Sequence, residues 1–291
     1  MRKIILITSL AVMSLCVSAQ HYIGVSADLK TAFQFDQLEQ TRSAIGGGGQ
    51  LGFTYEFQRN YFVLNTGLAI GYTMSSQLLD SLHFSFPMYD TEGRSMNYVG
   101  AIDNRHDMSQ MLHFKLPLMI GVAGGHFYGL VGFVFDYTLP SWTTVTANLY
   151  TAGDYEDRYY NLLENMPNHG YDEQRIKSNG KLKYRPDFRI AAELGGSFFI
   201  GNASKKRPKA KIGLFFEYGL TDANSAESIS NKLYDFNTDQ YLKVEMNHIY
   251  TTNAAYGLKI NNFELGVRAH VLFDVGGVST NNGCNCHKRY L

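Results

Sequence analysis

The sequence has little tryptophan, proline or cysteine, and it almost lacks helical periodicity. Its 291 residues include one tryptophan, six prolines and three cysteines. Beyond residue 19, no apolar run reaches the roughly 18 residues of a membrane-spanning helix. Hydrophobic residues also almost never recur at the three- and four-residue spacing of an amphipathic helix. We therefore expect few helices of any kind and no membrane helix in the mature chain.

An excess of charge of one sign is also missing. The chain holds 26 Lys and Arg against 26 Asp and Glu. Removing residues 1–19, which include Arg2 and Lys3 and no acid, leaves 24 bases against 26 acids, about −2. This balance gives no reason to expect nucleic acid as a partner.

Residues 1–19 are predicted to be an export signal. Their positively charged start is followed by an apolar segment over residues 4–17 and a small-residue cleavage site before Gln20. Cys16 follows the bulky Leu15, where lipoprotein signals place a small residue, so no lipid anchor is expected. The mature chain should begin near Gln20, outside the cytoplasm.

Residues 50–74 contain the pattern around which the rest of the chain is organised. Every second residue over positions 51–57 is apolar or aromatic, and the alternation resumes over residues 62–74 after Arg59-Asn60. Period-two alternation is typical of a strand, and so short a break joins two strands as a hairpin. Both runs reach the roughly 9–11 residues that a tilted strand needs to cross a bilayer. The stretch predicts a transmembrane β-hairpin.

The same alternation recurs along the chain. Further runs cover residues 22–35, 112–122, 127–144, 188–198, 211–220, 250–260 and 263–273. Single-chain bacterial barrels have an even number of strands. We therefore predict an all-β, transmembrane antiparallel β-barrel over residues 20–275 with eight strands, and ten as the alternative. Abundant aromatic residues and glycine agree with that architecture.

Short links between the runs alternate with long polar stretches. The long stretches lie near residues 77–107, 147–184 and 222–247. In outer-membrane barrels the short turns face the periplasm and the long loops face outside, so we expect these three stretches to be extracellular loops. Residues 147–184 are rich in Tyr, Asn, Asp and Glu, a composition that suits adaptable contacts.

Polar side chains on the inward face of the predicted strands are the main candidate site. They are Glu56, Asn65, His113, Lys115, Asp136, Arg189, Glu193, Glu217, Glu264, Arg268 and His270. An eight-stranded barrel is just wide enough for side chains to fill, and an isolated buried charge is unfavourable. We interpret the set as a structural network of paired charges. A conducting, charge-selective lumen is the alternative.

Catalysis is not expected. Ser197 shares the inward face of its strand, and His113 and His270 are the inward histidines, yet no spacing joins a serine, a histidine and a carboxylate. Geometry defines such triads, and the spacing alone supplies none. We predict no enzyme, no cofactor and no metal, and a membrane-embedded lipid hydrolase is the least favoured class.

The C-terminal tail, residues 276–291, is the second candidate site. It contains Cys284, Cys286 and His287, and these two cysteines are the only ones in the mature chain. A disulfide across one residue would be strained, and zinc needs about four ligands where this cluster offers three. We expect a plain periplasmic tail, then a partner-docking peptide, then a metal site.

Several motifs resemble those of small outer-membrane β-barrel proteins from Bacteroidetes-type bacteria. The resemblance is carried by the Ala19-Gln20 junction, by His-Phe-Lys-Leu-Pro-Leu at residues 113–118, and by Phe-Glu-Tyr-Gly-Leu-Thr at residues 216–221. It covers most of the mature chain and implies the same fold and location. That family includes components of the type IX secretion machinery and accessory barrels of larger complexes. The chain lacks the peptidoglycan-binding domain of OmpA-type proteins.

Together these features predict an integral outer-membrane protein surrounded by outer-membrane lipid. We expect a non-enzymatic accessory or scaffold subunit of an envelope complex, in secretion or outer-membrane protein assembly. Its partners would be other outer-membrane or periplasmic proteins. A small pore or transport barrel is the alternative function.

Overall fold

The computed structural model describes nine segments of the chain. They are residues 19–35, 41–89, 93–155, 161–167, 171–201, 207–223, 234–237, 243–251 and 259–277. The body of the predicted export signal and the tail residues Cys284, Cys286 and His287 lie outside these segments and stay predictions. Strand β13 ends at Gly277, so the first two residues of the predicted tail belong to a strand.

Almost all of the described chain is strand. The strands are β1 (Gln20–Phe35), β2 (Thr41–Arg59), β3 (Phe62–Tyr89), β4 (Ser95–Gly124), β5 (Phe127–Thr138), β6 (Ser141–Tyr155), β7 (Asn161–Leu163), β8 (Glu173–Leu182), β9 (Asp187–Phe199), β10 (Lys209–Gly219), β11 (Tyr234–Asn237), β12 (Lys243–Met246) and β13 (Asn261–Gly277). Among the described residues, no helix has both the length and the apolar character needed to cross a membrane.

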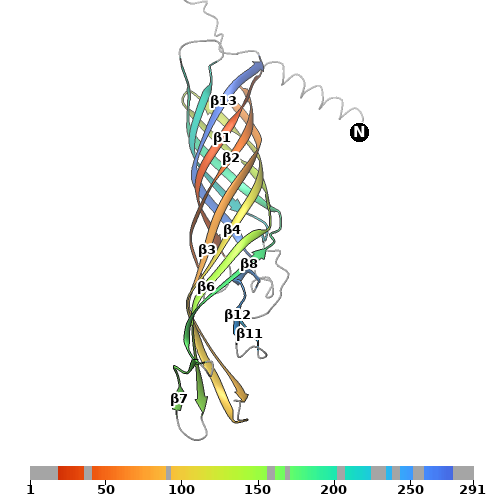
Figure 1. The fold of residues 1–291 in the computed structure, drawn as a ribbon. Coiled ribbons are helices and arrows are strands. Elements are labelled where there is room, and N and C mark those ends of the chain that lie inside the picture. The colour runs from red at the N-terminus through yellow and green to blue at the C-terminus, as the bar shows by residue number, and fades with distance from the viewer. Residues whose placement is uncertain are drawn as a thin grey trace, which may run out of the picture.

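Eight strands form a closed antiparallel barrel. Their order is β3-β2-β1-β13-β10-β9-β5-β4, and pairing of β3 with β4 closes the ring (Figure 1). Closure removes the free strand edges that an open sheet would expose. The prediction of eight antiparallel strands is confirmed, and the region near residues 250–273 contributes one barrel strand, β13.

One end of the barrel carries short links. Asn60 and Gly125, both with positive φ (54° and 60°), lie in the turns after β2 and β4. Strand β1 begins and β13 ends at this end, because Gln20 pairs with both Gln58 and Gly277. The turn at Asn60 is the predicted hairpin break.

At the other end, a sheet that we call the arm extends well beyond the ring. It consists of residues 75–111 of the β3–β4 hairpin together with β6, β7 and β8 (Figure 1). Strand β4 pairs with β5 as far as His113, and then with β6 from Gln110 outward. The change of partner makes the arm a continuation of the barrel wall.

The structure corrects several of the predicted boundaries between strands and loops. The stretches near residues 77–107 and 147–184 were expected to be loops, but they are largely strand, because strands in a water-exposed sheet carry polar residues that weaken the hydrophobic signal. The run over residues 127–144 is two strands, separated at Leu139-Pro140, where β4 changes partner. Residues 249–251 form a helical turn and not a strand, and the third stretch contains the β11–β12 hairpin.

The buried face of the β3–β4 hairpin changes within the arm, a few residues beyond the ring. In β3 the buried positions are odd up to Leu79, whereas from Leu82 onward the even positions face inward; β4 changes likewise between Ile102 and Arg105. Asn104 has a positive φ of 49°, and the β4–β6 register shifts between Asp103 and His106. An extra residue in a strand exchanges its two faces, so this irregularity reverses which side chains are buried.

Candidate functional site: the charged barrel interior and its outer mouth

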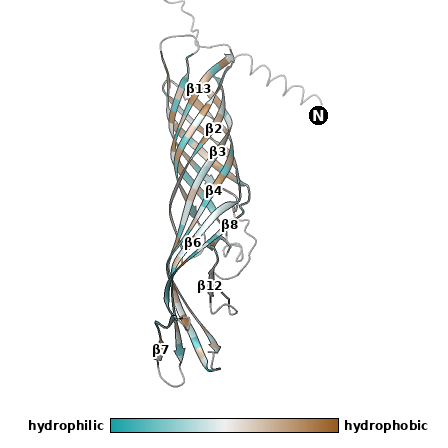
Figure 2. Cartoon of the chain, viewed as in Figure 1, coloured by the Kyte–Doolittle hydropathy of each residue, from teal (hydrophilic) through white to brown (hydrophobic). Residues whose placement is uncertain are grey.

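The barrel reverses the usual distribution of polarity. Large apolar side chains alternate outward, and Figure 2 shows hydrophobic and hydrophilic residues interleaved along the barrel strands. The inside holds six buried cations and seven buried acids. These thirteen residues are Lys30, Lys115, Arg189, Lys209, Lys211, Arg268, Asp28, Glu56, Asp136, Asp187, Glu193, Glu217 and Glu264.

Glu264 on β13 is the centre of the network. Its Oε2 lies 2.8 Å from Lys30 Nζ and 2.5 Å from Lys115 Nζ, and its Oε1 accepts a hydrogen bond from Arg189 Nη1 at 2.6 Å. Lys115 also donates to Glu217 at 2.5 Å. A carboxylate with three cationic donors has its lone pairs well satisfied, which is the condition for holding charge in a dry interior.

Arg189 on β9 joins three acids at the arm end of the barrel. Besides Glu264, it lies 2.5 Å from Asp136 Oδ2 and 3.1 Å from Asp187 Oδ2. These partners come from β5, β9 and β13, which together with β10 form one side of the ring, so Arg189 ties that wall of the barrel together. The interior is crossed by Lys115, because β4 lies opposite β13 in the ring and Lys115 pairs with Glu264.

Arg268 on β13 repeats this arrangement further along the barrel. It pairs with Glu217 at 2.8 Å, Asp28 at 3.1 Å and Glu193 at 3.3 Å, and its guanidinium lies 4.0 Å from the centre of the Phe215 ring. His270 Nε2 lies 3.0 Å from Glu193 Oε1. These partners come from β1, β9 and β10, so Arg268 ties a second arc of neighbouring strands together.

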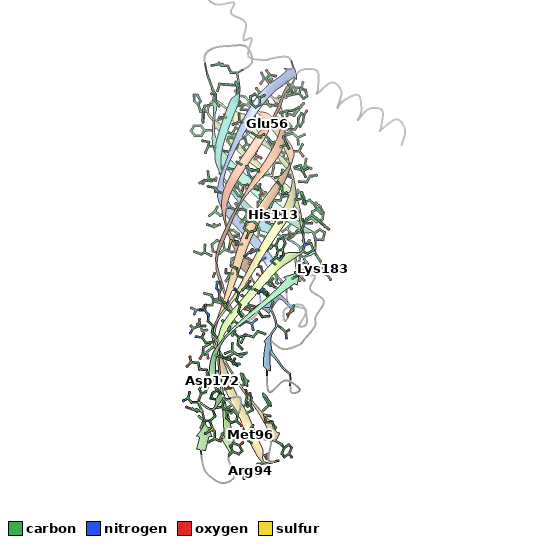
Figure 3. The ribbon with its side chains drawn as sticks, in the orientation of Figure 1. Glu56, Arg94, Met96, His113, Asp172 and Lys183 are labelled. Carbon is green, nitrogen blue, oxygen red and sulfur yellow. The ribbon has the colours of Figure 1, made fainter. Side chains whose placement is uncertain are left out.

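A third group fills the end with the short links. Glu56 accepts from Lys209 at 3.0 Å and pairs with Lys211. Lys211 also lies 4.2 Å from the centre of the Tyr128 ring. Figure 3 shows Glu56 toward this end and His113 toward the arm.

His113 belongs to a group of three buried side chains that could in principle bind a metal ion. Its ring, Asp136 and Glu264 place potential ligand atoms within 4.8 Å of one another. However, Lys30 Nζ is 3.2 Å from His113 Nε2, and Arg189 pairs with both carboxylates. Because Lys30 and Arg189 already pair with these ligand atoms, the three residues do not fit a metal site. The His113 ring fits here because residue 71 is glycine, since a Cβ on Gly71 would collide with the ring.

The structure buries all eleven predicted inward residues inside the barrel and brings all of them except Asn65, which hydrogen-bonds to Thr54, into the charged groups. Sequence reasoning missed Asp28, Lys30, Asp187, Lys209 and Lys211. Asp28 and Lys30 stand at alternate positions of a run that was predicted as a strand, so the alternation could have identified them. Lys209 was assigned to a basic link and lies in β10. Among the described residues, neither inward histidine hydrogen-bonds to Ser197, so no triad is assembled.

A segment between β12 and β13 packs at the arm end of the barrel, against β1 and β4. We call residues 247–251 the plug. Ile249 and Tyr250 are 0% and 2% exposed, and Tyr250 packs with Tyr184, Met111 and Leu182. The Tyr250 hydroxyl also hydrogen-bonds to Gln34 on β1.

The plug is attached to β4 by a buried ion pair. Arg105 donates two hydrogen bonds to Asp107, at 2.7 and 2.8 Å, and a third to the carbonyl of Asn247. Asp107 in turn accepts the backbone N–H of Ile249 at 2.9 Å. Burial raises the pKa of Asp107, but the adjacent Arg105 outweighs it and holds that pKa below its usual value.

His248 lies within this attachment as a neutral ring. Its Nδ1 accepts the backbone N–H of Tyr250 at 3.2 Å, which requires that nitrogen to be unprotonated. Burial lowers the pKa of His248 to about 4, with Arg105 adding to the shift and Asp107 opposing it. The plug is thus attached at the arm end of the barrel by contacts that are compatible with neutral pH.

Comparisons with known proteins add little to this geometry. No protein-family model matches the chain, and no curated protein matches it. Among solved structures, Ail, the attachment invasion locus protein of Yersinia pestis, is 9% identical with a TM-score of 0.30, over 87% of this chain and 99% of that chain. The Ail complex with the heparin analogue sucrose octasulfate gives 10% identity and a TM-score of 0.25, with the same coverage.

Neisserial surface protein A is also among the matches. It is 9% identical with a TM-score of 0.27, over 87% of this chain and 97% of that chain. Such likenesses establish neither the fold nor the function of this chain, which rest on its own strands and side chains.

Proposed function

We propose that the chain is an integral outer-membrane β-barrel with a closed interior, which presents its arm as a docking surface for other envelope proteins. It acts as an accessory or scaffold subunit of a larger complex, in secretion or outer-membrane protein assembly. The observation that carries the proposal is the contrast between an interior bridged by ion pairs and an arm with its own apolar core.

The exterior supports a membrane location. From Phe62 to Met74, strand β3 presents apolar side chains outward, and the same holds on the neighbouring strands. At about 3.3 Å per residue and a tilt of about 40°, that length corresponds to a band roughly 30 Å high. The hydrocarbon core of a bilayer has about this thickness. Exposed aromatic residues lie near both limits, as in outer-membrane barrels: Tyr61, Phe127, Phe198, Phe273, Tyr72, Tyr137, Trp142 and Phe188.

The short links supply the orientation. Outer-membrane barrels place short turns in the periplasm, so the arm lies outside the cell and the chain ends lie in the periplasm. On this view residues 276–291, with Cys284, Cys286 and His287, are available to periplasmic partners.

The arm supports the scaffold role. Phe84, Tyr98, Ile102 and Leu149 are buried together in it, so it is a packed structure and not a set of loops. Rigid surfaces of this kind suit protein docking because little ordering is needed on binding. The proposal includes no enzymatic activity, no cofactor and no nucleic-acid partner.

Conductance and co-purification test the proposal separately. In planar bilayers the chain should give negligible conductance, because the Lys115–Glu264 and Lys211–Glu56 pairs cross the interior. Mild-detergent purification of the tagged protein from its own membrane should recover stoichiometric partner chains, and deletion of residues 80–104 should release them. A stable open channel, or a solitary barrel with an intact arm, would contradict the scaffold role and favour the pore.

A further inference from the structure

Beside the rim of the barrel, five cations project from alternate positions of β8 and the link that follows it. They are Arg175, Lys177, Lys181, Lys183 and Arg185, and we call them the basic stripe; all five are exposed. Leu182 and Tyr184 between them are buried, so the intervening cations must point outward. Figure 3 shows Lys183 at the side of the molecule, at the level where the arm leaves the barrel.

The basic stripe is not neutralised by its surroundings. None of the five cations forms an ion pair with another described residue. The side chains beside it on β6 are Trp142, Thr144, Thr146 and Asn148, which pair with Lys181, Asn179, Lys177 and Arg175. These β6 neighbours offer hydrogen-bond donors and carry no negative charge, and the exposed acid Glu173 stands two residues before Arg175, at the end of the stripe far from Lys181. A row of unpaired cations on a wall of hydroxyl and amide groups favours an anionic ligand.

The position of the basic stripe relative to the apolar band of the barrel indicates which kind of anion it binds. Arg185 precedes the exposed Phe188 by three residues, about 10 Å along an extended chain, and Phe188 lies at the limit of the apolar band. Trp142, directly opposite Lys181, is 55% exposed. Tryptophan prefers the boundary between acyl chains and headgroups, so cations at its level meet the headgroups themselves.

We propose that Lys181, Lys183 and Arg185, with Trp142 beside them, bind the phosphate groups of anionic lipid headgroups in the leaflet around the arm. Arg175 and Lys177 extend the same surface outward along β8. The inference rests on the proposed outer-membrane location and adds a specific lipid class to it. It would hold the barrel at a defined depth and rotation, with the arm directed away from the surface.

The single tryptophan allows a local test. The full mature chain is reconstituted in phosphatidylcholine vesicles that contain dansyl-labelled phosphatidylglycerol or dansyl-labelled phosphatidylcholine, the dansyl group being on an acyl chain. Energy transfer from Trp142 should show a roughly fivefold preference for the phosphatidylglycerol, the factor that one basic residue contributes at an anionic surface. The preference should weaken at high salt.

Two variants make the test specific. The neutral triple variant Lys181→Gln/Lys183→Gln/Arg185→Gln should lose the preference, and the charge-conserving variant Lys181→Arg/Lys183→Arg should keep it. All these positions are exposed, and the mobility difference between heated and unheated samples on a gel verifies that each variant is folded. A preference that survives in the neutral variant would overturn the proposal.

Failure of the inference and failure of the membrane location give different results. If Trp142 is quenched by brominated lipid but shows no headgroup preference, the barrel is inserted and only the lipid site is wrong. If Trp142 is not quenched and the chain does not float with the vesicles, the membrane location is wrong as well. Binding of a soluble acidic polysaccharide or protein, without lipid preference, would also overturn the lipid assignment.

Discussion

Strands β3 and β4 run through both the barrel and the arm, but they bury opposite kinds of side chain in the two regions. In the barrel, β3 and β4 bury polar groups such as Asn65, His113 and Lys115, and expose apolar ones. In the arm, the same strands bury Phe84, Tyr98 and Ile102. The alternation of polar and apolar residues is therefore not enough to say which face is inside. The surroundings of each segment decide which face is buried. The one-residue irregularity at Asn104 marks the place where the buried face changes.

Removing a cation from the barrel interior should have the largest effect. Arg189→Met leaves Asp136, Asp187 and Glu264 short of a partner, so the free energy of unfolding should fall by about 3–5 kcal/mol. Denaturant unfolding of the reconstituted barrel measures it. The matched control is Arg42→Met, whose exposed pair with Asp80 has side chains 68% and 71% exposed, and which should leave stability almost unchanged. Equal effects would mean that the interior ion pairs do not stabilise the barrel.

Making a cavity in the arm should destabilise the arm and leave the barrel unchanged. Leu149 on β6 is 0% exposed, so Leu149→Ala should lower the free energy of local unfolding by about 2–5 kcal/mol. Hydrogen exchange of β6 and β8 should accelerate, while that of β1 and β13 stays constant. Leu162→Ala, at a site 47% exposed, is the control. Loss of protection in the whole molecule would show that barrel and arm unfold as one unit.

The irregularity at Asn104 can be tested directly. A β-branched residue disfavours positive φ, so Asn104→Val should cost about 1–3 kcal/mol, whereas Asn104→Gly should be tolerated. The effect should appear as faster exchange of the amides of residues 103–106. If valine and glycine behave alike, the reversal of faces does not depend on the backbone conformation of Asn104.

The smallest effect that we expect is the loss of plug stability at acidic pH. The pKa of His248 in the folded protein, about 4, lies below its ordinary value near 6.5 because of burial, so the folded state binds fewer protons between these values. Stability is therefore complete above pH 6.5 and falls as the pH drops toward 4. From pH 7 to pH 5.5, attachment of the plug should weaken by about 1 kcal/mol.

Exchange of the Ile249 and Tyr250 amides, corrected for the intrinsic rate, measures this change. The variant His248→Gln has no titrating ring and should show a flat profile over the same range. An unchanged pH response in that variant would assign the effect to another group, with Asp107 the nearest carboxylate.

Much of the barrel follows from residue alternation. The hairpin around Arg59-Asn60, the runs at residues 112–122 and 211–220, and the inward charges at His113, Lys115, Arg189 and Glu217 all follow from period two and polarity. A strand between an apolar exterior and a polar interior has maximal contrast between its faces, so its signal is strong. The arm has weaker contrast, because water covers its outer faces and threonine, tyrosine and asparagine suit both sides.

The sequence by itself determined the alternating strands, the mixture of charges that must pair inside, and the short turns at one end. Only the tertiary structure decided which charges meet, because Lys30 and Glu264 are 234 residues apart and their contact depends on closure of the ring. The arm, the plug at His248 and Tyr250, and the basic stripe beside Trp142 likewise depend on strand pairing across long separations. Local patterns report local environments, whereas these features arise where distant segments are brought together.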